Sequence, residues 1–185
     1  ALNNINSLSD YLEKYNRGNH SAELIKLLAD KYSDKGEHDK AISLFNELLI
    51  SSNQSKNDNE YAKYAIATLE LKKHNTAIIE KYLKQNTESS FYKTAINDYA
   101  SYLNRNAWKM AELDSSLNNA LDKINTGLSL IDNTNQSYPY LLDTKAEILW
   151  KLNKNKEAIK IIEEAIILDP ESKYYKEQKE KFSDF

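Results

Sequence analysis

The stretch LLDTKAEILWKLNKNKEAIKIIEEAIILDP, from Leu141 to Pro170, decides the fold of this chain. Ala146 lies inside one segment of helical periodicity, and Ala158 opens a second segment twelve residues later. In the second segment apolar residues recur at three- and four-residue intervals, as on the buried face of an amphipathic helix. Pro170 ends that helix, because proline disfavours helix in the residue before it. The stretch therefore predicts two antiparallel helices that pack closely where their side chains are small.

The same spacing of small residues recurs upstream, which indicates an internal repeat. Three further segments each contain two alanines that are twelve or thirteen residues apart. These pairs are Ala29 and Ala41, Ala65 and Ala77, and Ala107 and Ala120. From one pair to the next the intervals are 36, 42 and 39 residues. We therefore expect four helix pairs joined by links of unequal length.

The repeated unit resembles the tetratricopeptide repeat, which has small residues in both helices and a closing proline. The matching residues of the opening stretch are Ala146, Leu149, Ala158, Ile162, Ala165 and Pro170, whereas Lys145 stands where a leucine is usual. The resemblance implies an all-α, TPR-like superhelix of about four helix pairs with a C-terminal capping helix. It also implies a concave groove, lined by the first helix of each pair, that binds another protein.

The predicted array is one domain over residues 1–185. Its expected parts are an N-terminal capping or lead-in helix at 1–17, pairs at 20–52 and 57–87, a segment at 89–133, a pair at 137–168 and a capping helix at 170–183. The second pair is degenerate, because Lys81 and Lys84 stand where apolar residues belong. The segment at 89–133 contains the third pair, and its residues 89–113 form either one long helix or two helices that meet near Asn104. For the capping helix we expect Asp169 as N-cap and Pro170 in the first turn.

Composition argues against several classes of function. A net charge of −3 and a pI near 5.7 argue against a nucleic-acid binder, which normally carries a basic face. The chain contains no cysteine, and no apolar run approaches the roughly 20 residues of a membrane span. Its histidines lack the four-residue spacing of a helical metal site, and no catalytic motif is present. We therefore predict no enzyme activity, no cofactor, no metal, no nucleic-acid partner and no membrane insertion.

The predicted binding surface lies on the first helices, offset from the packing alanines. Its candidate partner-binding residues are Lys26, Asp30, Asn104, Arg105, Trp108, Tyr140, Asp143, Glu147 and Trp150. Aromatic and arginine side chains are favoured at energetic hot spots, so we expect a scaffold or adaptor that binds a peptide or helix. The acidic members disfavour a ligand with a terminal carboxylate and favour a neutral, aromatic or basic peptide. The alternative for both tryptophans is packing between neighbouring helix pairs.

A closer resemblance implies a second function. The segments NRNAWKMAE, LLDTKAEILWKL and YYKEQKEKF together resemble the helical C-terminal region of bacterial thioredoxin-like proteins with tetratricopeptide repeats. This resemblance implies an accessory domain that positions clients for a redox domain elsewhere, in an exported or periplasmic protein. The start at Ala1 is then expected for a piece of a longer chain. A third hypothesis is self-assembly through the degenerate pair; otherwise we expect a monomer or weak dimer.

Overall fold

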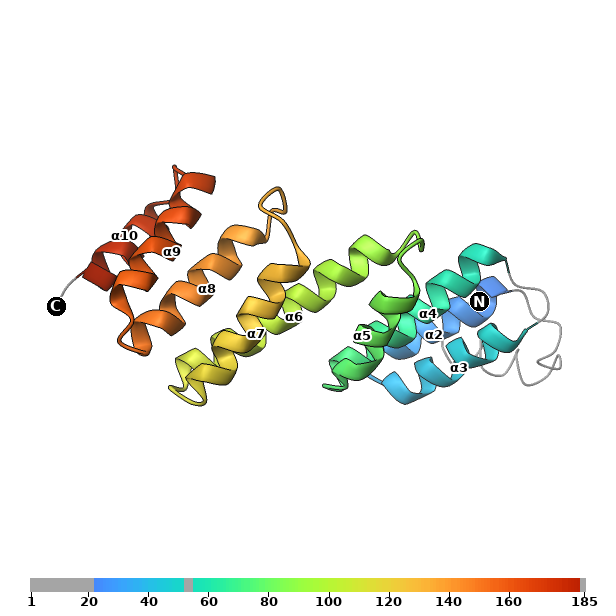
Figure 1. Cartoon of the computed structure of the whole chain (residues 1–185). Coiled ribbons are helices and arrows are strands. Elements are labelled where there is room, and N and C mark those ends of the chain that lie inside the picture. The colour runs from blue at the N-terminus through green and yellow to red at the C-terminus, as the bar shows by residue number, and fades with distance from the viewer. Residues whose placement is uncertain (1–21, 52–54, 184–185) are drawn as a thin grey trace. The chain divides into compact units, whose positions relative to one another are not determined.

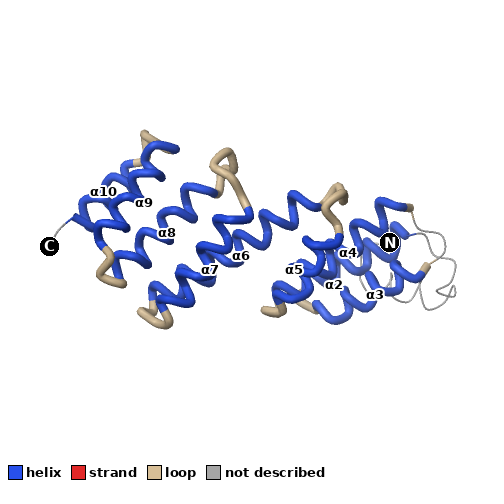
Figure 2. Tube along the Cα trace, in the orientation of Figure 1, coloured by secondary structure: helices blue, strands red, loops and turns tan. Residues whose placement is uncertain are grey.

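The computed structural model describes residues 22–51 and 55–183, and every regular element in these ranges is a helix (Figure 1; Figure 2). The helices are α2 (Ala22–Asp34), α3 (His38–Ile50), α4 (Lys56–Lys72), α5 (Thr76–Gln85), α6 (Tyr92–Glu112), α7 (Leu117–Leu130), α8 (Tyr138–Lys151), α9 (Asn155–Leu168) and α10 (Lys173–Ser183). The predicted all-α helical repeat is confirmed. The helix expected at 1–17 lies outside the described residues.

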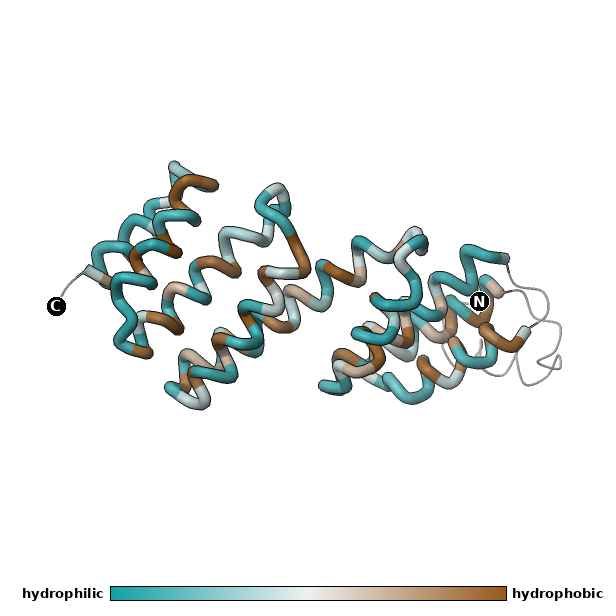
Figure 3. Tube along the Cα trace, viewed as in Figure 1, coloured by the Kyte–Doolittle hydropathy of each residue, from teal (hydrophilic) through white to brown (hydrophobic). Residues whose placement is uncertain are grey.

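The chain divides into two compact units, Ala1–Ala95 and Ile96–Phe185. In the first unit α2 pairs with α3 and α4 pairs with α5, and α2, α3 and α4 share a core that includes Phe45. In the second unit the C-terminal part of α6 packs with α7 and α8, while α9 and α10 complete a further core around Phe182. Apolar and polar segments alternate along the helices, as expected for amphipathic helices that pack on one another (Figure 3).

Buried small residues mark the helix crossings, but the register of the second pair differs from the prediction. Ala77 is exposed, and the buried residue at the fourth position of α5 is Ile79. The equivalent residue of α4 is Ala67, which lies five residues before the helix end, as Ala29 does in α2. The prediction placed Ala65 at this crossing. Ala65 is buried as well, so two alanines of α4 satisfy the expected pattern.

With this register the repeats are nearly equal in length. The alanines that lie five residues before the end of each first helix are Ala29, Ala67, Ala107 and Ala146. The intervals between them are 38, 40 and 39 residues. The unequal links predicted from the sequence are therefore a consequence of the wrong register in α4.

The four turns inside the helix pairs have the same backbone geometry. The second residue after each first helix has a positive φ, and the next amide donates to the carbonyl five residues before it at 2.9–3.0 Å. This is the Schellman arrangement that commonly ends a helix. The residues with positive φ are Gly36, His74, Asp114 and Asn153. Only one of the four is glycine, so the sequence alone does not reveal that the turns are equivalent.

We expect Gly36→Ala to lower the free energy of unfolding by about 1–2 kcal/mol, because the left-handed conformation is strained for a residue with a Cβ. The φ of Gly36 is 76°, and a Cβ built there would meet no atom within 4 Å, so the cost is conformational alone. Urea denaturation measures the change. The matched control is Asn153→Gly at the equivalent turn, which should leave stability unchanged or slightly higher. Equal stability of wild type and Gly36→Ala would contradict this turn geometry.

The structure settles the continuity of α6, which the sequence left open, and corrects the predicted start of α10. The helix α6 is continuous over 21 residues and does not break near Asn104. The helix α10 begins at Lys173, three residues after Pro170. Asp169 does not begin α10: its amide donates to the Ala165 carbonyl at the end of α9, at 3.0 Å. The cap of α10 comes from Ser172, whose hydroxyl accepts a hydrogen bond from the Tyr175 amide at 3.3 Å.

Candidate functional site

A groove of about 520 Å³ lies on the second unit, where three helices contribute side chains. The lining residues are Asn104, Arg105, Trp108, Lys109 and Glu112 of α6, Tyr140, Asp143 and Thr144 of α8, and Tyr174 of α10. Five of the nine residues predicted to bind a partner are among them, and all five come from the first helices of the third and fourth pairs. The sequence did not single out Tyr174 for this surface, because it lies on the capping helix.

Helical periodicity explains why these residues of α6 share a face. Ala107 and Ala111 are fully buried in the core shared with α7. Asn104 and Trp108 lie three residues before and one residue after Ala107, so they emerge beside the packing face. Arg105 is exposed, whereas Trp108 is half-buried. The packing of α6 on α7 therefore fixes which side chains line the groove.

Asp143 is the buried charge of the groove. The residue is only 8% exposed. One of its carboxylate oxygens accepts a hydrogen bond from the Tyr174 hydroxyl at 3.3 Å. The pKa of Asp143 is raised to about 6, mainly by burial. The Tyr174 hydrogen bond and Lys181 act to lower this pKa, whereas Glu147 acts to raise it. The other oxygen, Oδ1, is buried and has no hydrogen-bond partner.

Glu147 and Trp150 contact the capping helix instead of lining the groove. The Lys181 ammonium donates to the Glu147 carboxylate at 2.7 Å and lies 4.3 Å from the centroid of the Trp150 ring. The rings of Trp150 and Phe182 have centroids 5.8 Å apart. This corrects the predicted placement of both residues. The cause is that α10 packs against α8 where a further first helix would lie.

Lys26 and Asp30 are likewise engaged by a neighbouring first helix. The Lys26 ammonium donates to Asp58 of α4 and lies 5.8 Å from the centroid of the Tyr61 ring. The Tyr61 hydroxyl donates to the Asp30 carboxylate at 2.9 Å. Burial raises the pKa of Asp30, while the hydrogen bond from Lys26 lowers the pKa of Asp58. These two predicted residues therefore stabilise the contact between α2 and α4 and do not form an open surface.

The polar contacts of α2 and α8 come from two equivalent positions, three residues before and one residue after the packing alanine. Lys26 and Asp30 stand at the same distances from Ala29 as Asp143 and Glu147 do from Ala146. Each of these four residues is bonded to a residue 31 to 34 positions further along the chain. A search for complementary polar residues at that separation would have found the partners. On α6 the same two positions carry Asn104 and Trp108, and these line the groove.

We expect a double-mutant cycle on Glu147→Gln and Lys181→Met to give a coupling energy of about 1 kcal/mol. The reason is that the Glu147 side chain is buried, while Lys181 keeps partial contact with water. Urea denaturation of the four proteins measures the coupling. The matched control is the Glu163–Lys179 pair, whose atoms are 2.8 Å apart with both side chains exposed, and whose coupling should be near zero. Equal coupling in the two pairs would show that burial does not strengthen the Glu147 contact.

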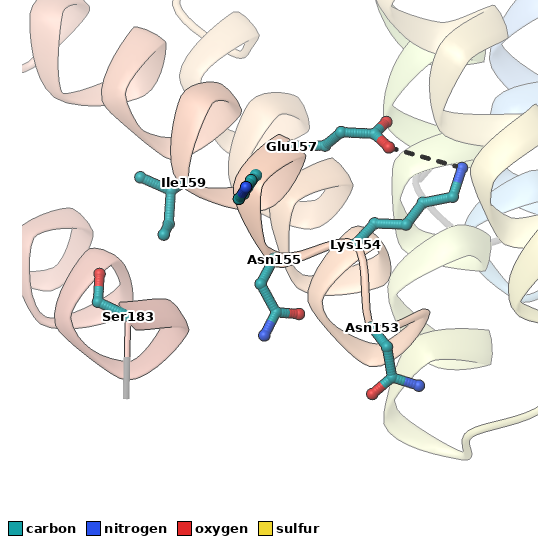
Figure 4. A pocket seen from close by; sticks show the side chains of 7 residues that line it. Asn153, Lys154, Asn155, Glu157, Ile159 and Ser183 are labelled. Atoms are coloured by element: carbon teal, nitrogen blue, oxygen red, sulfur yellow. Dashed lines mark ion pairs between the residues drawn. The ribbon is translucent and has the colours of Figure 1, made fainter. Parts of the chain in front are cut away.

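A second hollow, of about 680 Å³, lies where the turn before α9 approaches the end of α10 (Figure 4). Asn153, Lys154, Glu157 and Ser183 contribute to its wall. Lys154 and Glu157 form an ion pair at 3.9 Å, and both side chains are exposed. This hollow consists of surface side chains and contains none of the residues predicted to bind a partner.

Among the residues that the structure describes, no helix is long and apolar enough to cross a membrane. Within 22–51 and 55–183, no group of three histidine, cysteine or acidic side chains is placed to hold a metal ion.

Comparison with known proteins supports the repeat assignment. Residues 140–172, which contain most of α8 and all of α9, match the tetratricopeptide repeat. No curated protein matches the chain in sequence. Among solved structures, the apo form of the quorum sensor NprR from B. thuringiensis is similar, with a TM-score of 0.55 and 16% sequence identity. The alignment covers 98% of this chain and 51% of that one, so the chain spans about half the length of NprR.

At 16% identity this similarity shows the fold alone, and it leaves the thioredoxin-like alternative untested. The repeat match adds a sequence signal in the region that carries the opening stretch. The helix pairs, their buried alanines and their identical turns agree with both findings. Residues 140–172 therefore carry a tetratricopeptide repeat match, within a chain whose fold is an all-α helical repeat.

Proposed function

We propose that this module binds a short segment of a partner protein in the groove formed by α6, α8 and α10. The observation that supports this most directly is the exposure of aromatic side chains at the groove. Tyr140 is 63% exposed and Tyr174 is 45% exposed, and Trp108 lies beside them. Large aromatic side chains that remain in contact with water around a hollow are typical of a binding surface.

The size and chemistry of the groove favour a peptide over a folded domain or a reaction. A volume of about 520 Å³ accommodates a few side chains of a ligand. The lining residues supply amide, hydroxyl, cationic and carboxylate groups, which recognise a peptide backbone and its side chains. They include no histidine, serine or cysteine.

Selection of a displayed library of random short peptides on the immobilised protein tests the proposal. We expect the recovered peptides to bind the wild type, and Trp108→Ala to weaken them about tenfold or more, as for a hot-spot residue. Arg105→Ala should also weaken binding. The matched control is Lys160→Ala, an exposed cation of α9 outside the groove.

Folding is checked by circular dichroism and thermal unfolding, because Trp108 is half-buried and its loss affects packing. Arg105 is exposed, so Arg105→Ala keeps the test meaningful if Trp108→Ala is unstable. If the recovered peptides bound wild type, Trp108→Ala and Arg105→Ala equally well, the groove would not be the binding site.

A further inference from the structure

The groove contains two buried hydrogen-bond acceptors without partners. They are Oδ1 of Asp143, a residue that is more than nine-tenths buried, and Oδ1 of Asn104. Both residues line the groove, one from α8 and one from α6. Buried polar atoms in folded proteins almost always have a partner, because an unpaired one costs about 1–3 kcal/mol. Two unpaired acceptors in one groove point to a ligand that brings donors.

We propose that the groove recognises a basic side chain, lysine or arginine, of the bound peptide through Asp143 and Asn104. This inference rests on the proposed function, since it assigns the chemistry of a peptide in the same groove. Lysine carries three N–H donors and arginine five, and neither side chain has an acceptor. A basic side chain therefore matches one carboxylate oxygen and one amide oxygen that both lack donors.

The aromatic side chains of the groove suit the same ligand. Trp108, Tyr140 and Tyr174 all line it, and the face of an aromatic ring attracts a cation. The apolar stem of lysine or arginine also packs well against such rings. A carboxylate surrounded by aromatic rings thus offers both an ionic and an apolar contact to one side chain.

The chain uses this combination elsewhere between its own helices, and two cases involve the first helices and the helix that follows on the same side. Lys26 is bonded to the Asp58 carboxylate and lies over the ring of Tyr61. Lys181 is bonded to the Glu147 carboxylate and lies over the ring of Trp150. In the groove the carboxylate and the rings are present, but Asp143 Oδ1 has no donor. A ligand lysine or arginine would complete a further contact of this kind.

The other charges around Asp143 modify the attraction without replacing it. Arg105, Lys109 and Glu112 of α6 are exposed at the groove, where water screens them. Lys181 of α10 is bonded to Glu147 of α8. A competing ligand, an acidic side chain held by Arg105 and Lys109, is therefore an outcome that the experiment must separate from a basic one.

Protonation of Asp143 gives the recognition a pH dependence. Burial raises the pKa of this carboxyl to about 6 in the free protein. A cationic ligand binds the ionised form, so affinity should be highest above that pH and fall as the pH drops through it. From the linkage between binding and protonation, the affinity at pH 5 should be about tenfold lower than at pH 8.

The experiment uses displayed peptide libraries in which one central residue is fixed as lysine, arginine, methionine or glutamate. We expect the protein to retain the lysine and arginine pools at least about tenfold better than the methionine pool, which matches lysine in length without its charge. Asp143→Asn should abolish this preference while keeping the side-chain volume. The matched control is Glu157→Gln, which removes an exposed carboxylate of α9 outside the groove and should leave the preference unchanged.

Each result distinguishes this inference from the proposed function. Retention of the lysine and methionine pools to the same extent would overturn the basic ligand and leave peptide binding intact. Retention of the glutamate pool, lost in Arg105→Ala, would overturn it in favour of an acidic ligand. Retention of the lysine pool by Asp143→Asn as well as by wild type would remove Asp143 from recognition. Failure to retain any pool would overturn the proposed function itself.

Discussion

Replacing Phe182 by alanine is expected to lower the free energy of unfolding by about 3–5 kcal/mol, because a large buried ring is lost and a cavity remains. Phe182 has no exposed surface and is the main apolar contact of the strongly polar helix α10. Its ring packs against Trp150 of α8 with centroids 5.8 Å apart. Since α10 also carries Tyr174 and Lys181, loss of this anchor should loosen the contacts of Asp143 and Glu147 as well.

Chemical denaturation followed by circular dichroism measures the loss of unfolding free energy. Two further variants serve as comparisons. Phe182→Leu keeps most of the volume and should cost clearly less than the alanine variant. Ile167→Ala, at a residue that is 75% exposed, should change the free energy by no more than about 0.5 kcal/mol. In a Trp108→Phe background Trp150 is the remaining tryptophan, so its fluorescence reports on the contact directly. A loss below that of Phe182→Leu would contradict the anchoring role of this ring.

Replacing Asp143 by asparagine is expected to raise the free energy of unfolding by about 1–3 kcal/mol at pH 8. Burial raises the pKa of Asp143 from 3.8 to about 6 in the folded chain. The folded state therefore holds this proton more tightly than the unfolded state. Stability falls as the pH rises from about 4 to about 6, and above pH 6 the folded chain bears the full cost of the buried charge. Asparagine has nearly the same shape and carries no charge.

Urea denaturation of both proteins at pH 8 and at pH 4 tests this expectation. The stabilisation should be large at pH 8 and should shrink at pH 4, where the carboxyl is protonated in the folded wild type. The matched control is Glu112→Gln, an exposed carboxylate of the same groove, which should have little effect at either pH. An equal gain at both values would show that the charge of Asp143 is not its cause.

These stability and binding expectations have opposite signs for the same substitution. Asp143→Asn should make the chain more stable and the groove less selective for a basic side chain. Residues that bind a ligand often lower the stability of the free protein, because their polar groups remain unpaired until the ligand arrives. A variant that gained stability and lost the preference would support both arguments at once.

The groove was partly visible in the sequence. The offset from the packing alanines placed Asn104, Arg105 and Trp108 on one face of α6 and Tyr140 and Asp143 on one face of α8, and the structure brings these residues to one groove. The same rule also selected residues that are covered by a neighbouring helix. A helical pattern shows where a side chain points on its own helix, but it contains no information about the element that faces it.

The sequence by itself determined the all-α repeat, because helical periodicity, small residues at the crossings and helix-ending signals are local properties of the chain. Only the tertiary structure decided that Ala67 and Ile79 hold the second crossing, since Ala65 of the same helix is buried too. It also decided that Lys26 and Glu147 are paired while Asp143 keeps an unpaired oxygen. Those outcomes depend on helices more than 30 residues away in the chain, and their packing geometry is set by the whole core of each unit.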